Sequence, residues 1–107
     1  MFTRVVEIHC KSGLSKEVTD TIQDKVVSLL KKQRGFVDET ILVSDTDPTH
    51  VLGLSYWNSK EDADRYRREE FTKVHEILEP YLESEPVVRT FDVHTSTPHK
   101  IAAGKAA

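Results

Sequence analysis

The chain has 107 residues, of which 37% are hydrophobic and 31% charged, and its formal net charge is −3. That length suits a single domain, and that composition argues against wholesale disorder. Acidic and basic residues are mixed along the chain, without a basic stripe interleaved with aromatic residues, so we expect no nucleic-acid partner.

Apolar periodicity predicts a series of strands and helices along the chain. Residues 15–34 have apolar residues at helical spacing, with Ser15 as the cap and Gly35 just beyond the end. A second helix starts after Ser59, and polar residues predict that it is broken near residues 69–72. Alternating apolar residues predict four strands, over residues 2–10, 36–45, 50–57 and 87–95.

This order of elements predicts an α+β fold. Strand, helix, two strands, helix and strand form the ferredoxin-like βαββαβ arrangement, an antiparallel sheet with both helices on one face. Several strands are apolar on both faces, so the open face of the sheet needs a cover. A second copy of the chain can supply it, so we expect a homodimer in the form of a dimeric α/β barrel. We assign residues 1–95 to this domain and residues 96–107 to a flexible C-terminal tail or dimer arm.

Alternation also assigns the side chains of residues 36–45 to two faces of their strand. Simple alternation in residues 36–45 places Val37 with Glu39 on one face and Phe36 with Leu42 on the other.

The strong motifs of cofactor and metal chemistry are missing from the sequence. It has no phosphate-binding glycine loop, nucleophile elbow, His-Glu-x-x-His motif, paired cysteine motif, or flavin or nicotinamide fingerprint. The five histidines show no spacing typical of a metal site. We therefore expect neither an organic cofactor nor a metal, so a reaction here would use the reactivity of the substrate itself.

Cellular location can be predicted only indirectly. Cys10 is the single cysteine and allows no internal disulfide, which fits a reducing compartment. The first residues do not resemble a signal peptide, and no apolar run is long enough to span a membrane. We expect a cytoplasmic protein with no membrane partner.

Among the histidines, His75 is a candidate general base. It lies on the second helix one turn from Phe71 and Leu78, where an imidazole can act near neutral pH. The alternative is a partly buried histidine that bonds a backbone group. His9 and His94 lie on strands that this topology makes neighbours, so they can pair or simply be surface histidines.

Two aromatic residues fall where the sheet meets the helices. Trp57 ends the third strand and Tyr66 follows on the next helix, so both can line an apolar pocket. Filling the core is the alternative explanation for both. Asn58 lies between them, at the predicted strand-to-helix turn.

A family resemblance adds to this interpretation. Gly35-Phe36-Val37, then Asp47-Pro48, then Val51 through Trp57 and on through Asn58-Ser59-Lys60-Glu61-Asp62-Ala63 resemble the antibiotic biosynthesis monooxygenase family. The resemblance covers about residues 2–95. It implies a ferredoxin-like dimer with a pocket between each sheet and its helices. The resemblance also implies oxygenation of aromatic or quinol-like substrates, a reaction that several members of the family carry out without metal or flavin.

The resemblance also suggests roles for individual residues. In this chemistry the substrate is deprotonated, and its electron-rich anion reacts with oxygen. His75 would be the base, and Tyr66 and Trp57 would be pocket walls or hydrogen-bond donors in the catalytic site. We assign His9, Asn58 and Phe71 to substrate binding.

The sequence is compatible with three functions. The first is a cofactor-independent monooxygenase acting on a small aromatic or quinol-type substrate. The second is a non-catalytic dimeric module that binds a small apolar molecule. The third is a haem-binding or haem-degrading relative. In that branch of the family the first strand has an asparagine and the second helix a tryptophan. Here the first strand has no asparagine, and Tyr66 stands at the tryptophan position.

Overall fold

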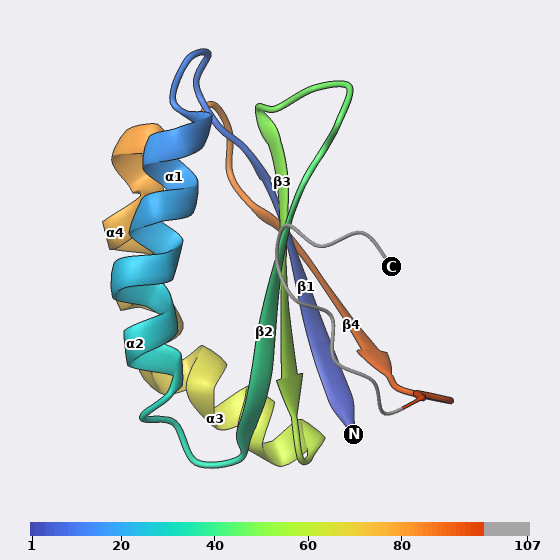
Figure 1. The fold of residues 1–107 in the computed structure, drawn as a ribbon. Coiled ribbons are helices and arrows are strands. Elements are labelled where there is room, and N and C mark those ends of the chain that lie inside the picture. Colours follow the sequence, from blue (N-terminus) through green and yellow to red (C-terminus); the bar gives the residue numbers. More distant parts are fainter. Residues whose placement is uncertain (98–107) are drawn as a thin grey trace.

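The computed structural model describes residues 1–97 and confirms the ferredoxin-like α+β fold (Figure 1). Four strands form one antiparallel sheet in the order β2-β3-β1-β4. The two strands nearest the chain's start and end are therefore neighbours, as this topology requires. The strands are β1 (Phe2–His9), β2 (Phe36–Val43), β3 (His50–Trp57) and β4 (Val87–Asp92).

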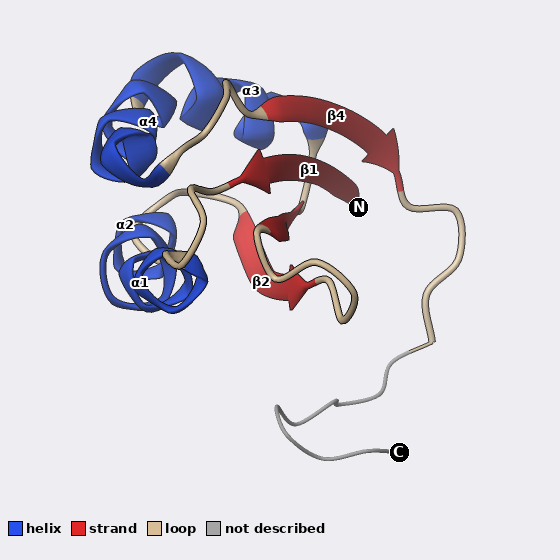
Figure 2. Ribbon diagram, turned by 90° about the horizontal axis from the view of Figure 1, so that it is seen from above, coloured by secondary structure: helices blue, strands red, loops and turns tan. Residues whose placement is uncertain are grey.

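Two helical segments cover one face of this sheet (Figure 2). The first runs through α1 (Ser15–Thr21), a π-helical turn η1 (Ile22–Val26) and α2 (Val27–Leu30). The second contains α3 (Lys60–Glu69), α4 (Phe71–Leu78) and a 3₁₀ turn η2 (Glu79–Tyr81). The predicted break near residues 69–72 is confirmed: Glu70 separates α3 from α4, with φ −126° and ψ −21° outside the helical region.

The ends of the first helical segment differ from the prediction. Leu14 rather than Ser15 precedes the helix, and no side chain caps it. The segment ends at Leu30, not residue 34, because Lys32 and Gln33 donate to carbonyls only three residues back. Gly35 (φ +83°) therefore belongs to the turn into β2, where a side chain would collide with Asp62.

The start of the second helix agrees with the sequence. Ser59 is the N-cap, and its Oγ accepts a hydrogen bond from the Asp62 backbone N–H at 3.2 Å. The Asp62 carboxylate in turn accepts from the Ser59 hydroxyl at 3.0 Å. This resembles a capping box and fixes where α3 leaves the end of β3.

A bulge in β2 overturns the simple alternation predicted for residues 36–45. The register passes from Phe36 opposite Trp57 directly to Asp38 opposite Tyr56, which leaves Val37 as an extra residue. Phe36 therefore packs against the core on the same side as Glu39, while Val37 is exposed. Strand ends also shift, because β1 ends at His9, β2 at Val43 and β4 at Asp92.

The core lies between the helices and the sheet. Trp57, Val18 and Val51 are its largest fully buried side chains. The remaining buried hydrophobic residues are Phe2, Ile8, Cys10, Ile22, Val26, Leu30, Ala63, Tyr66, Val74, Leu78 and Leu82.

None of the helices in residues 1–97 is both long and apolar enough to cross a membrane.

None of the helices that the structure describes lies over the second face of the sheet (Figure 2). Strand register assigns both apolar and polar side chains to this open face. Phe91, Leu42 and Val87 are among its exposed apolar residues. The open face comprises Thr3, Val5, Glu7, His9, Asp38, Thr40, Leu42, His50, Leu52, Leu54, Tyr56, Val87, Arg89 and Phe91.

The tail predicted for residues 96–107 lies largely outside the described residues, as does His99.

Candidate active site

A cavity of about 40 Å³ lies between the sheet and the helices. It has space for about three water molecules. The strands contribute its floor and the two helical segments its walls, including the π-helical turn, a distortion common at functional sites. It is lined by Arg4, Val6, Ile8, Ile22, Val26, Leu30, Glu39, Ile41, Gly53, Ser55, Tyr66, Phe71, Val74, His75, Leu78 and Pro86.

Three polar residues form a row across the cavity floor. Ser55 in β3 lies opposite Arg4 of β1 on one side and Glu39 of β2 on the other. Side chains directly opposite one another in an antiparallel sheet point to the same face. The register of the sheet therefore brings one cation and one carboxyl group together under the helices.

Arg4 is the most unusual residue of the site. Only 3% of it is exposed, yet its Nε and Nη2 atoms have no hydrogen-bond partner within residues 1–97. Its guanidinium carbon lies 4.9 Å from the centre of the Phe71 ring and 5.6 Å from that of Tyr66, within range for cation–π attraction. Burial lowers the pKa of Arg4 from its ordinary value. Unpaired buried donors are rare and call for an explanation, such as a bound water, an ion or a role in the reaction.

Glu39 carries the matching acceptor. Its buried Oε2 atom also has no hydrogen-bond partner in the described part of the chain. Burial raises the pKa of Glu39 to about 8, with a further rise from Asp38 that the charge of Arg4 opposes. A Cβ at Gly53 would approach Oε1 of Glu39 to 3.1 Å, so the missing side chain leaves room for this carboxyl group.

The predicted aromatic residues surround this polar row. Tyr66 and Phe71 line the cavity, and burial raises the pKa of the Tyr66 hydroxyl. Trp57 is wholly buried and does not line the cavity. It stacks on Tyr66 with ring centres 5.1 Å apart, and its Nε1–H donates to the Ser55 hydroxyl at 2.9 Å. Trp57 therefore positions two residues of the site.

His75 lines the cavity from α4. Its Nε2 lies 2.8 Å from Oε2 of Glu85, an exposed carboxylate. The side chain of His75 is 26% exposed, so the imidazole is in contact with both solvent and cavity. A histidine oriented by a carboxylate in this way is suited to proton transfer at the cavity mouth.

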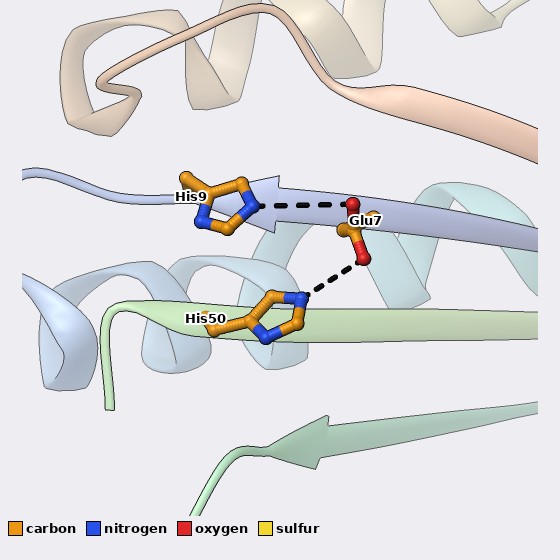
Figure 3. A group of neighbouring side chains, drawn as sticks. All are labelled: Glu7, His9 and His50. Atoms are coloured by element: carbon orange, nitrogen blue, oxygen red, sulfur yellow. Dashed lines mark hydrogen bonds and ion pairs between the residues drawn. The ribbon is translucent and has the colours of Figure 1, made fainter. Parts of the chain in front are cut away.

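The other two predicted binding residues lie elsewhere. Asn58 is exposed at the turn into α3, where its backbone N–H donates to Gly35. His9 lies on the open face of the sheet, on the side away from the cavity, and stacks with His50 (Figure 3). The suggested pairing of His9 with His94 does not occur, because antiparallel β1 and β4 place these residues at opposite ends.

Sequence reasoning missed Arg4 and Glu39. Arg4 shares its face of β1 with Phe2, Val6 and Ile8, and an arginine at a core position of a strand was the available signal. Glu39 gave a similar signal, because it alternates with Ile41. Together they provide a cation for an anionic ligand and an acceptor for its proton, within largely apolar walls.

Comparison with known proteins agrees with this fold. The family model for antibiotic biosynthesis monooxygenases matches residues 1–77. A search of curated proteins found no match.

Three solved structures illustrate the likeness. The chain is 16% identical to a variant of SnoaB, a cofactor-independent oxygenase from Streptomyces nogalater, with a TM-score of 0.76 over 92% of this chain and 97% of that one. A Streptomyces coelicolor monooxygenase in complex with nanaomycin D is 17% identical, with a TM-score of 0.75 over 92% of each chain. A conserved protein from Methanosarcina mazei is 18% identical, with a TM-score of 0.71 over 85% and 91%.

At such low identity the solved structures establish a shared fold, whereas the family model covers well over half of the chain. This protein therefore belongs to the antibiotic biosynthesis monooxygenase family.

Proposed function

We propose that the protein is a cofactor-independent monooxygenase acting on a small aromatic or quinol-type substrate. The observation that carries this proposal is the presence of unpaired polar atoms of Arg4 and Glu39 inside an apolar cavity. A phenol supplies what both lack, because its hydroxyl can donate to the carboxylate and its anion can accept from the guanidinium. Membership of the family supports the reaction class.

The residues suggest a sequence of steps. A base removes a proton from the bound substrate, and the resulting anion is stabilised by the Arg4 guanidinium in a site with little water. The electron-rich anion then reduces molecular oxygen. For an anthrone, a ring CH₂ and O₂ become a carbonyl and water, so one oxygen atom enters the product and the substrate supplies all the electrons.

Two residues are candidates for the base. His75 lies at the cavity mouth with Glu85 behind it, which supports the role predicted from the sequence. Glu39 lies inside, and its pKa of about 8 matches a proton acceptor that works slightly above neutral pH. We propose that Glu39 takes the substrate proton and that His75 exchanges it with solvent.

Oxygen consumption by purified protein against a panel of hydroquinones and anthrones tests this proposal. We expect Glu39→Gln and His75→Ala each to lower uptake at least tenfold, since general base catalysis contributes about 10²–10⁴. His94→Ala, which changes an exposed histidine outside the site, serves as the control. Uptake that is unchanged in both site variants would refute the assigned roles.

A small-molecule-binding module is the alternative that the narrow cavity favours. Benzene occupies a cavity of about 150 Å³, so even one ring requires side chains to move outward here. Such a module would show thermal stabilisation by a ligand of the panel without oxygen uptake. A haem-binding relative would instead show a Soret band on addition of hemin.

We also propose that the protein works as a homodimer. Exposed Phe91, Leu42 and Val87 lie on the open face of the sheet, and a second copy can cover them. Light scattering at micromolar concentration should give twice the chain mass of 12.2 kDa, and a mass of one chain would exclude the dimer. A cytoplasmic location stays a prediction from the sequence, which fractionation of cells can test.

A further inference from the structure

A second polar cluster lies on the open face of the sheet, on the side away from the cavity. It contains Glu7, His9 and His50, at the end of β1 and the beginning of β3 (Figure 3). Each of the three offers one metal-ligand atom, and these atoms all lie within 4.8 Å of one another. The oxidation chemistry proposed above does not use this cluster.

Backbone geometry explains why the two histidines meet. His9 and His50 are directly opposite in the antiparallel pair β1–β3. One residue beyond this pair, the N–H of Cys10 donates to the Thr49 carbonyl. His9 and His50 are therefore a non-hydrogen-bonded pair, in which the two residues exchange no backbone hydrogen bonds. Side chains are closest at such positions. The rings accordingly stack at 4.7 Å between centres and within 5° of parallel.

Glu7 completes the cluster because it lies two residues before His9 on the same face. Its Oε2 is 3.0 Å from Nε2 of His50, and its Oε1 is 3.9 Å from Nε2 of His9. Both ring nitrogens are thus directed toward one carboxylate, as Figure 3 shows. To bind one ion at about 2.0–2.1 Å from each nitrogen and about 2.0–2.2 Å from an oxygen, the two stacked rings would have to turn out of their parallel arrangement, because the lone pair of an imidazole nitrogen lies in the ring plane.

The local charges are mixed but include two carboxylates. The Glu7 carboxylate contacts both histidines and interacts with Arg89 of the neighbouring strand. Hydrogen bonds from Thr49 lower the pKa of Asp47, which lies in the neighbouring turn and interacts with both histidines. Arg89 also acts on Glu7, and its positive charge opposes a bound ion.

We propose that Glu7, His9 and His50 form a binding site for a divalent first-row transition-metal ion such as Zn²⁺. Two imidazoles and one carboxylate are ligands that such ions prefer, whereas Mg²⁺ and Ca²⁺ prefer oxygen ligands. The three protein ligands leave further coordination positions, which water can fill in a single chain and which a group of the second copy can fill if the proposed dimer covers this face. All three ligands come from one chain, so the site requires neither the proposed dimer nor the proposed oxygenase activity.

Titration of untagged, chelator-treated protein with Zn²⁺ in a calorimeter tests this proposal. We expect one Zn²⁺ per chain, and binding at least ~10-fold weaker in His9→Ala and in His50→Ala, since even outer-shell changes cost about 10–100-fold. Glu7→Gln should weaken binding as well. His94→Ala, an exposed histidine at the other end of the sheet, should bind Zn²⁺ like the unchanged protein.

Several results would overturn the site. These are the absence of saturable binding, equal binding by His50→Ala, loss of binding in His94→Ala, or displacement of Zn²⁺ by an equal concentration of Mg²⁺. His9 and His50 are partly exposed, so their variants should fold, and their metal-free melting curves check this. If one of them does not fold, Co²⁺ titration of the corresponding asparagine variant, followed by visible absorption, decides instead.

Discussion

Replacing Arg4 by methionine is expected to make the protein more stable and less active at once. Methionine retains an unbranched apolar stem of similar length, so it fills the same space without the buried charge. A preformed ligand site predicts both effects, because its residues lower the stability of the ligand-free protein and are needed for activity.

The magnitude follows from the contacts of Arg4. Two buried donors without partners cost about 1–3 kcal/mol each, which their removal recovers. Loss of the cation–π contacts with Phe71 and Tyr66 costs about 1–2 kcal/mol. The net gain in the free energy of unfolding is about 0–5 kcal/mol, centred on about 2.5 kcal/mol, and each kcal/mol raises Tm by about 4–8 °C for a domain of this size.

Urea unfolding followed by fluorescence is the natural assay, because the single tryptophan, Trp57, is wholly buried. Oxygen uptake, measured on the same samples, should fall about 10²–10³-fold, the usual effect of removing an anion-stabilising donor. Arg68→Met, an exposed change on α3, should alter stability by no more than about 0.5 kcal/mol and leave uptake unchanged.

Two results would refute this reasoning. If Arg4→Met lowers the free energy of unfolding by about 1 kcal/mol or more, the guanidinium stabilises the fold and its donors are satisfied. If stability rises but oxygen uptake persists, the buried charge has no part in the reaction.

Three further predictions concern the site and the open face. Because burial raises the pKa of Glu39 from 4.5 to about 8, its protonated form is favoured by folding, and its contribution to stability falls as pH rises between these values. Between pH 4 and pH 9, the free energy of unfolding of Glu39→Gln, measured in urea, should therefore rise relative to that of the unchanged protein by on the order of 4 kcal/mol. Gly53→Ala brings a methyl group to 3.1 Å from the Glu39 carboxyl group, so oxygen uptake should fall while the fold persists by circular dichroism. Leu42→Asp places a charge on the open face, where Leu42 is 47% exposed, so light scattering should show the mass of one chain; a persisting dimer would mean that this face is not the interface.

Local patterns in the sequence were sufficient for the elements and their order. The helical stripe of residues 15–34 and the alternation in the strands follow from burial of one face, which is a local property. The break at Glu70 was also predictable, since polar residues interrupt the apolar stripe there. Strand faces were less secure, because a single bulged residue at Val37 reverses the assignment of Phe36.

The candidate site was only partly predictable for the same reason. Tyr66, Phe71 and His75 line the cavity, and their helical spacing predicted that they lie on the helix face that packs toward the sheet. Trp57 was placed correctly at the end of β3, but only the structure shows that it supports Ser55 and Tyr66 from behind. Arg4 and Glu39 were missed, because a charged residue in a strand is most often exposed.

The amino-acid sequence by itself determined the α+β class, the order of strands and helices and the resemblance to the family, because each depends on residues close together in the chain. Tertiary structure alone decided which polar residues meet. Arg4 and Glu39 are 35 positions apart, and His9 and His50 are 41 apart, yet the register of β1, β2 and β3 brings the members of each pair together on one face. Register is set by packing of the whole sheet against the helices, and no local pattern reports it.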